Sequence, residues 1–343
     1  MRSRELRPAT TDPLSPLASL IDGYQTTAVL HAAIELDLPD LLAQTPADVG
    51  TLASRTGADV SALGRLLAVL SALGVILDTG NGRFALTEIG QALTTTSPSG
   101  MRQRLLLATS QYAPVWARIA DSVRHGTTAF VQLHGCSPWE YRQRNPEAGQ
   151  LFNDWLRLET GRVARQLAPV LDLPPDTHVA DIGGGTGALL NALLDLQPRL
   201  RATLFDQPHV IAQAEALWHS EGRSRRPATV AGDFFDAIPV RADVYLLKSV
   251  LHDWNDADSV RILQHCHRAM PTGARLVLIE RLLPAHPSED PATHLVDFHM
   301  MLVTGGHERS FDQFRELLGQ AGFSHFRTRP TPSAFTIIES IRP

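Results

Sequence analysis

Hydrophobic and polar positions divide the chain into two parts with different periods. Up to about residue 170, apolar residues recur at helical spacing; the segment that begins at Val60 carries Leu63, Leu66, Leu67, Leu70 and Leu73 on one face. Beyond Pro174 and Pro175, which stop a helix and resist a strand, short apolar runs alternate with helical patterns. This alternation is typical of a doubly wound parallel sheet, which gives the α/β fold class.

Seven strands are expected in the second part. The parallel ones are residues 179–182, 202–205, 229–231, 244–247 and 276–279. Ser324–Arg329 and Ala334–Ile341 are expected to form an antiparallel pair at the sheet edge. Ser310 followed by Gln313 predicts a capping box that begins a helix, and Gly322 follows its end.

The N-terminal pattern predicts a winged helix. A helical segment over Leu14–Leu42 breaks around Leu38 and Pro39, and a short helix over Val49–Arg55 precedes the one from Val60, which Gly74 ends. Two short strands, 75–77 and 84–86, follow as a hairpin. Winged helices often bind DNA, but a recognition helix needs several cations, and only Arg65 lies on the second helix. Dimerisation is therefore the favoured role of this region.

Composition narrows the function further. The chain has 343 residues, 43% hydrophobic and 20% charged, with a net charge of −5 and a pI near 6.3, so two domains are expected and no basic field attracts nucleic acid. Two cysteines, Cys136 and Cys266, exclude a disulfide framework and suit a reducing cytoplasm. No signal peptide and no apolar run long enough to cross a bilayer is evident, which predicts a cytoplasmic protein without a membrane partner.

A glycine-rich turn follows the first strand of the expected sheet. Gly183, Gly185 and Gly187 stand at alternate positions after Asp181, and a helical pattern follows. The turn fits a relaxed dinucleotide fingerprint, and it equally fits the methyl-donor site of class I methyltransferases. Asp206, which closes the second strand, suits a ribose diol in either interpretation.

Motifs downstream decide between these interpretations. They are AspIleGlyGlyGlyThrGly (181–187), PheAspGlnPro (205–208), GlyAspPhePhe (232–235), LeuLysSerValLeuHisAspTrp (247–254), IleGluArg (279–281) and GlyGlyHisGluArg (305–309). In combination the chain resembles the caffeate-type or hydroxyneurosporene-type O-methyltransferases, which use S-adenosylmethionine. The resemblance covers nearly the whole chain and implies a class I methyltransferase sheet (Rossmann-like) behind an α-helical, winged-helix dimerisation domain.

The resemblance implies a role for each matching residue. His252 matches the catalytic base, and Glu280 and Glu308 match the acids that hold it. The donor-binding set is Asp181, Gly183, Gly185, Asp206, Gln207, Asp233, Phe234, Lys248, Ser249 and Trp254. The candidates for the acceptor pocket, for which core packing is an equal alternative, are Phe152, Leu156, His299, Met300 and Val303.

Such a base has a physical rationale. A phenol ionises near pH 10, whereas an ordinary histidine near 6.5 is neutral enough at pH 7 to accept its proton. A carboxylate behind the imidazole fixes its tautomer and stabilises the cation. On position alone, Glu280 and Glu308 could instead be exposed partners of Arg281 and Arg309, and Asp253 could be only a residue near the start of the next helix.

The expected activity is methyl transfer from S-adenosylmethionine to a hydroxyl of an aromatic or polyketide-type molecule, with S-adenosylhomocysteine as product. The enzyme is expected to act as a homodimer without a metal, in specialised metabolism. A non-methylating reaction, pericyclic or decarboxylative, on the same scaffold is the alternative. Leu156 and Glu159 depart from the residues of plant members, so the identity of the acceptor does not carry over from those members.

The expected organisation has four parts. Residues 1–13 are expected to be disordered, 14–105 to form a winged-helix dimerisation domain, 106–173 a helical linker and pocket region, and 174–343 a donor-binding catalytic domain.

Overall fold

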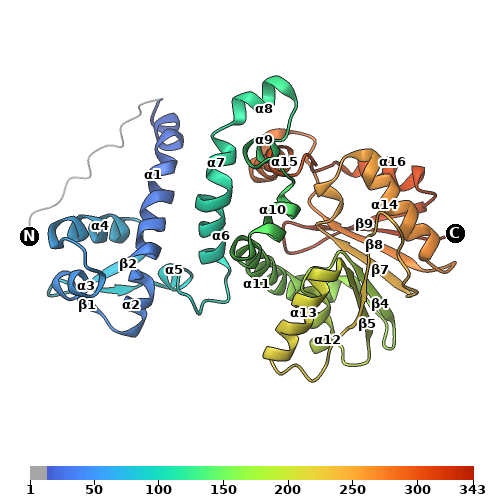
Figure 1. Ribbon diagram of the computed structural model, residues 1–343, viewed down its shortest axis with the longest axis horizontal. Coiled ribbons are helices and arrows are strands. Elements are labelled where there is room, and N and C mark those ends of the chain that lie inside the picture. The colour runs from blue at the N-terminus through green and yellow to red at the C-terminus, as the bar shows by residue number, and fades with distance from the viewer. Residues whose placement is uncertain (1–13) are drawn as a thin grey trace, which may run out of the picture. The chain divides into compact units, whose positions relative to one another are not determined.

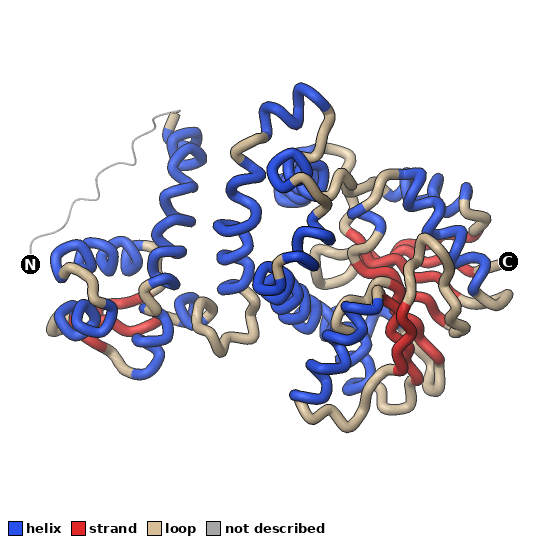
Figure 2. Tube along the Cα trace, in the orientation of Figure 1, coloured by secondary structure: helices blue, strands red, loops and turns tan. Residues whose placement is uncertain are grey.

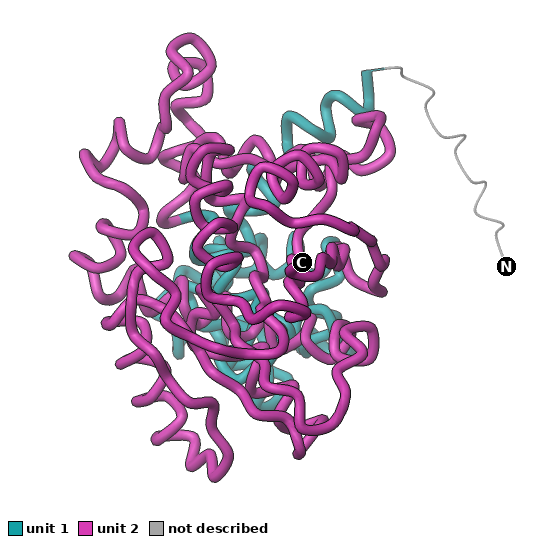
Figure 3. The backbone as a smooth tube through the Cα atoms, turned by 90° about the vertical axis from the view of Figure 1, so that its right-hand side faces the viewer, with its two compact units in different colours: residues 1–109 teal, residues 110–343 magenta. Residues whose placement is uncertain are grey.

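A computed structural model describes residues 14–343 of the chain (Figure 1). The disorder expected for residues 1–13 lies outside the described residues. Contacts group the chain into two compact units that divide after Thr109 (Figure 3). Helices dominate the first unit, whereas the second combines helices with a long sheet (Figure 2).

The first unit consists of helices packed with a small antiparallel sheet. The sheet has the order β1 (Ala47–Asp48), β3 (Arg83–Leu86), β2 (Ile76–Gly80). The helices are α1 (Ser15–Glu35), α2 (Leu38–Gln44), α3 (Val49–Thr56), α4 (Val60–Ala72), α5 (Glu88–Gln91) and α6 (Met101–Leu107).

Local hydrogen bonds explain why the helix–turn–helix segment forms where the sequence predicts it. The side chain of Asp48 accepts from the N–H of Thr51 at the start of α3, and that of Asp59 accepts from Ala62 at the start of α4. Gly57 ends α3 with φ of 72°. The expected helices and hairpin are thus confirmed, although Leu73 is 39% exposed and does not join the buried face of α4.

Two features of this unit differ from expectation. The break between α1 and α2 falls at Leu36 and Asp37, and Leu38 and Pro39 begin α2, because proline is compatible with the first turn of a helix. Strand β1 was not expected, since two residues are too few to show an alternating pattern.

The second unit contains a seven-stranded sheet with helices on both faces. The sheet has the order β6-β5-β4-β7-β8-β10-β9. Its strands are β4 (His178–Ile182), β5 (Arg201–Asp206), β6 (Ala228–Ala231), β7 (Val244–Lys248), β8 (Arg275–Glu280), β9 (Ser324–Pro330) and β10 (Thr336–Ile341). The helices of this unit are α7 (Ala113–Trp116), α8 (Ile119–His125), α9 (Ala129–His134), α10 (Pro138–Arg144), α11 (Pro146–Leu171), α12 (Ala188–Leu196), α13 (Pro208–Ser220), α14 (Asp256–Ala269), α15 (Pro291–Val303) and α16 (Phe311–Gln320).

Alternate residues of each strand enter different cores, as a sheet buried on both faces requires. Tyr245 and Leu247 of β7 pack with α14 and α16, whereas Val244 and Leu246 pack with α11, α12 and α13. The five parallel strands are confirmed, and so is the antiparallel C-terminal pair.

The last strand begins later than expected. β10 starts at Thr336 rather than Ala334, because the side chain of Thr331 donates to the carbonyl of Phe335 and holds the preceding residues as a turn. Of this C-terminal pair, β9 is the edge strand, since β10 pairs with β8 on its other side. The capping box of Ser310 and Gln313 is present at the start of α16. Between residues 14 and 343, no helix is both long and apolar enough to span a membrane.

Candidate active site

The predicted donor-binding residues, together with His252 and Glu280, lie at or just after the carboxyl ends of the parallel strands, where ligands bind in sheets of this kind. The glycine turn follows β4, with φ of 70° at Gly183, 61° at Gly185 and 74° at Gly187. Asp206, at the end of β5, accepts from the N–H of Gly185 at 2.8 Å and from that of Gln207 at 2.7 Å. A side chain added at Gly185 would meet nothing within 4 Å, so the space beside this backbone is open to a ligand.

Aromatic side chains stand next to this turn. The ring of Phe234 lies 5.9 Å from that of Trp254 in an edge-on arrangement. A Cβ atom added at Gly183 would lie 3.5 Å from the Phe234 ring. The side chain of Asp233 accepts from the N–H of Phe235 at 2.8 Å, which orients the loop after β6. These contacts form one wall suited to a flat ring system.

Lys248, at the end of β7, does not stand alone. Its Nζ lies 3.5 Å from Oε2 of Glu159 on α11, 3.4 Å from Oγ of Ser249 and 4.6 Å from the ring centre of Phe335. Glu159, noted in the sequence only as a departure from plant relatives, thus supplies the counter-charge of this buried lysine.

Asp181 provides a test of whether a donor fits here. Its carboxyl is buried, its Oδ1 has no hydrogen-bond partner, and burial together with the charge of Asp206 raises its pKa to about 7. An unpartnered buried acceptor is costly and fits a ligand that brings a hydrogen-bond donor or a positive charge. A nucleoside with a ribose diol and a cationic arm suits this acceptor, Asp206 and the aromatic wall.

His252 is held by two buried carboxylates. It lies in the 3₁₀ turn η2 (Leu251–Asp253) after β7, and its Nδ1 is 3.0 Å from Oε1 of Glu308 and 3.7 Å from Oε2 of Glu280. Glu280 is itself oriented, because its Oε1 accepts from the N–H groups of Val250 and Leu251 at 3.0 and 2.9 Å. The geometry leaves Nε2 of His252 free of a carboxylate at hydrogen-bonding distance.

The alternative of exposed Glu–Arg pairs is wrong. Glu280, Glu308 and Arg309 are fully buried. Arg309 reaches Asp256 at 2.8 Å and donates to the carbonyls of Leu251 and Trp254, so that it fastens the histidine turn rather than neutralising Glu308.

The protonation of His252 differs from that of an ordinary histidine. Burial lowers its pKa, but the carboxylates of Asp253, Glu280 and Glu308 outweigh burial and raise the pKa to about 10. Burial in turn raises the pKa of Glu280 to about 7. This direction is opposite to the one that a base neutral at pH 7 requires, because three acids surround one imidazole.

The same three residues offer ligand atoms within 4.8 Å of one another, a spacing that one metal ion can span. Nδ1 of His252 faces Glu308 as a hydrogen-bond partner, which favours a proton over a metal between them. Metal independence stays an expectation that a direct assay must test.

The acceptor candidates come from two helices. Phe152 and Leu156 lie on α11, and His299 and Met300 on α15; all four are partly exposed. Nδ1 of His299 accepts from Nε1 of Trp116 at 3.0 Å, and burial lowers its pKa to about 4, so it remains neutral. Val303 is corrected to a core residue: it is 2% exposed and packs in a buried cluster with Val115 and Phe130.

Sequence reasoning missed three residues around His299. Tyr112 contacts its ring edge-on at 4.4 Å, Trp116 holds its Nδ1, and Arg142 lies against Tyr112. The sequence signal for this group was Arg142 itself, because it stands four residues after Pro138 and therefore on the same face of a helix, which is the buried face of α10. Asp253 was underrated as well, since its Oδ2 lies 3.9 Å from Nε2 of His252.

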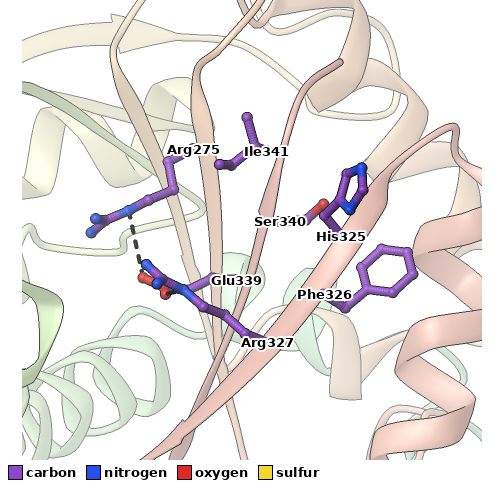
Figure 4. Close-up of a pocket in the computed structure, with 7 residues that line it drawn as sticks. All are labelled: Arg275, His325, Phe326, Arg327, Glu339, Ser340 and Ile341. Atoms are coloured by element: carbon purple, nitrogen blue, oxygen red, sulfur yellow. Dashed lines mark hydrogen bonds and ion pairs between the residues drawn. The ribbon is translucent and has the colours of Figure 1, made fainter.

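A hollow of about 380 Å³ lies elsewhere, among β8, β9 and β10 (Figure 4). None of the predicted site residues lines it. The buried Glu339 is among the residues that line it, and it pairs with Arg327 and Arg329 at 2.5 Å and with Arg275 at 3.5 Å. These charges are engaged with one another across three strands, which indicates a structural role.

Comparisons with known proteins agree with this geometry. Residues 116–324 match the model of the O-methyltransferase domain, and residues 18–96 match that of the O-methyltransferase dimerisation domain. The chain is 37% identical to phenazine O-methyltransferase PhzM of Lysobacter antibioticus over 330 residues, which cover 96% of each protein. It is 35% identical to the O-demethylpuromycin-O-methyltransferase of Streptomyces alboniger, over 94% of this chain and 88% of that one.

Solved structures extend the comparison to the ligand. The structure of human N-acetylserotonin methyltransferase in complex with SAM superposes with a TM-score of 0.87 at 27% identity, covering 98% of this chain and 99% of that one. The family matches span both units of the chain. The protein therefore belongs to the S-adenosylmethionine-dependent O-methyltransferases that carry an N-terminal dimerisation domain.

Proposed function

We propose that the protein methylates a hydroxyl group of an aromatic or polyketide-type small molecule, with His252 as the general base. The observation that carries this proposal is the hydrogen bond between Nδ1 of His252 and Glu308, which turns Nε2 of the same ring away from that carboxylate. Nε2 is the atom that receives the proton of the acceptor hydroxyl. The names of two relatives, a phenazine O-methyltransferase and an O-demethylpuromycin-O-methyltransferase, support a place in natural-product metabolism.

The donor is held by the residues around the glycine turn. Asp206 would receive the ribose hydroxyls, and Asp233 and Phe234 would bracket the adenine in a pocket that Trp254 also lines. The backbone of Gly183 and Gly185 would face the methionine arm. Asp181, Gln207, Lys248 and Ser249 complete this set. When bound, S-adenosylmethionine supplies a methyl group that its sulfonium charge activates for displacement.

The pKa of His252 fits a phenolic acceptor. Because a phenol also ionises near pH 10, a proton moves from the acceptor to an imidazole of pKa about 10 at little cost. Glu280 and Glu308 stabilise the imidazolium that forms.

Homodimer formation through the first unit is part of the proposal. Apolar side chains on one end of α1 are exposed, Leu17, Leu20, Ile21 and Tyr24 among them, and a second copy would cover them. Two free cysteines are compatible with action in the cytoplasm. No metal takes part in this mechanism.

The test is a methyl-transfer assay by mass spectrometry. Purified protein receives S-adenosylmethionine and a panel of phenols, hydroxyquinones and aromatic polyketide cores, with His252→Ala alongside. A product one methyl group heavier, absent with the variant although the donor still binds, is the expected result. Full activity of His252→Ala refutes the role of the base, and an altered product of unchanged methyl count favours the non-methylating alternative.

A further inference from the structure

Arg142 is a buried cation beside the acceptor candidates. It lies on α10 and is 8% exposed. Its Nε donates to Oε1 of Gln111 at 3.4 Å and its Nη2 to the hydroxyl of Tyr112 at 3.3 Å, while the guanidinium stacks 3.5 Å from the ring centre of Phe152. All of these partners are neutral.

The charge of Arg142 lacks a carboxylate in contact. No ion pair joins it to an acid within residues 14–343, and burial lowers its pKa, an effect that Tyr112 and Asp253 only partly oppose. Its Nη1 donates to no described residue and keeps some exposure to solvent. A buried cation in this state is costly, and an anionic ligand relieves that cost.

Neighbouring contacts hold the guanidinium in one orientation. Nε2 of Gln111 donates to the carbonyl of Ala148 at 3.0 Å, so that Oε1 is directed to Arg142. The stack on Phe152 fixes the plane of the group. A guanidinium group fixed in this orientation matches the planar geometry of a carboxylate better than the flexible ammonium group of a lysine does.

The same group of side chains connects Arg142 with His252. Tyr112, which Arg142 contacts, packs edge-on against His299, a candidate acceptor residue. His299 lies in the field of both Arg142 and His252, and Asp253, beside Nε2 of His252, is influenced by both as well. Arg142 and His252 therefore share neighbours, His299 on α15 and Asp253 in η2, and Tyr112 contacts both Arg142 and His299.

We infer that Arg142, oriented by Gln111 and Tyr112, binds the carboxylate of a hydroxylated aromatic acid whose hydroxyl faces His252. This inference rests on the proposed function and names its substrate class. Phe152 then contacts the aromatic ring of the acceptor as well as the guanidinium.

The experiment compares acids with their neutral counterparts. The probes are hydroxybenzoates, hydroxynaphthoates and hydroxyanthraquinone carboxylates, each paired with its primary carboxamide, at saturating S-adenosylmethionine. The variants are Arg142→Met and Arg142→Lys, and Arg144→Met on the same helix is the matched control because Arg144 is exposed. Binding of each probe to the S-adenosylhomocysteine complex is measured in parallel by calorimetry.

An acid is expected to exceed its amide by about tenfold or more in kcat/KM. Arg142→Met should raise KM for that acid about a hundredfold, the loss typical of truncating a buried charge pair, with less than about a threefold change for the amide. Affinity for the donor and all parameters of Arg144→Met should stay at wild-type values. If Arg142→Met does not fold, Arg142→Lys decides, with a KM raised for the acid alone.

The outcomes separate the two proposals. Acids that bind in an Arg142-dependent way without being methylated refute the proposed function and retain this binding site. Equal methylation of acids and amides, unaffected by Arg142→Met, retains the proposed function and overturns the inference. Failure of every acid to bind overturns it too.

Discussion

Nδ1 of His252 lies 3.0 Å from Oε1 of Glu308, although 56 positions separate the two residues in the chain. Glu308 comes from the segment after α15, and its own N–H donates to Asp297 at 2.8 Å, which orients this segment. The pair joins two loops at the carboxyl end of the sheet and sets the direction of Nε2. Replacing Glu308 by Gln keeps the shape and removes the charge that stabilises the imidazolium.

We therefore expect Glu308→Gln to lower kcat by about 10² to 10⁴, the range that general-base catalysis contributes, when each enzyme is measured at the plateau of its pH profile. The affinity for S-adenosylmethionine should remain unchanged. Glu316→Gln, an exposed change on α16, is the control. A kcat within a factor of three of the wild type contradicts the role of Glu308.

The pH profile follows from the raised pKa of His252. Since only the neutral imidazole accepts a proton, kcat/KM for a phenolic acceptor should rise with pH above 7 and level off toward pH 10. Glu280→Gln removes one negative charge near the ring, lowers the pKa of His252 and shifts the rising limb to lower pH. Gln still accepts from the N–H groups of Val250 and Leu251 through one oxygen. A limb centred at pH 6.5 in both enzymes refutes this account.

Asp206 controls donor affinity. Its carboxylate accepts from two backbone N–H groups of the donor site, and burial raises its pKa to about 6. Asp206→Ala should raise the Kd of S-adenosylmethionine about 10- to 100-fold, as expected for hydrogen bonds to a charged group. Because the ionised form is lost below pH 6, wild-type affinity should fall there, which calorimetry at several pH values measures. A pH-independent Kd between 5 and 8 argues against this role.

Gly187 and Gly161 give a matched pair for stability. Gly187 has φ of 74°, and a Cβ would lie 2.7 Å from Cζ2 of Trp218, whereas a Cβ at Gly161 in α11 meets nothing within 4 Å. Gly187→Ala should lower the free energy of unfolding by about 2 to 5 kcal/mol, from strain and overpacking. Gly161→Ala should raise it by about 0.5 to 1 kcal/mol through helix propensity. Urea titrations compare the two, and equal effects contradict the packing seen around Trp218.

Association through α1 is tested by charge. Leu20 is 79% exposed, and Ile21 next to it is exposed as well. A double change to Asp should convert a dimer into a monomer in size-exclusion chromatography with light scattering. Val123→Asp, at an exposed apolar position on α8, should leave the dimer intact. A double variant that remains dimeric excludes α1 as the interface.

The sequence by itself determined the features that depend on near neighbours. The spacing of apolar residues located the five parallel strands, the Ser310–Gln313 pair located a helix start, and the glycines after Asp181 located the turn. Each signal involves residues a few positions apart, whose geometry follows from backbone hydrogen bonding and sterics.

Only the tertiary structure decided which charges meet and how deeply they are buried. Arg309 pairs with Asp256 rather than Glu308, Glu159 neutralises Lys248, and Arg142 stays without an acid. The pKa of His252 and the core position of Val303 belong to the same class. These properties depend on segments distant in the chain and on the loss of water around them, and local patterns carry no measure of either.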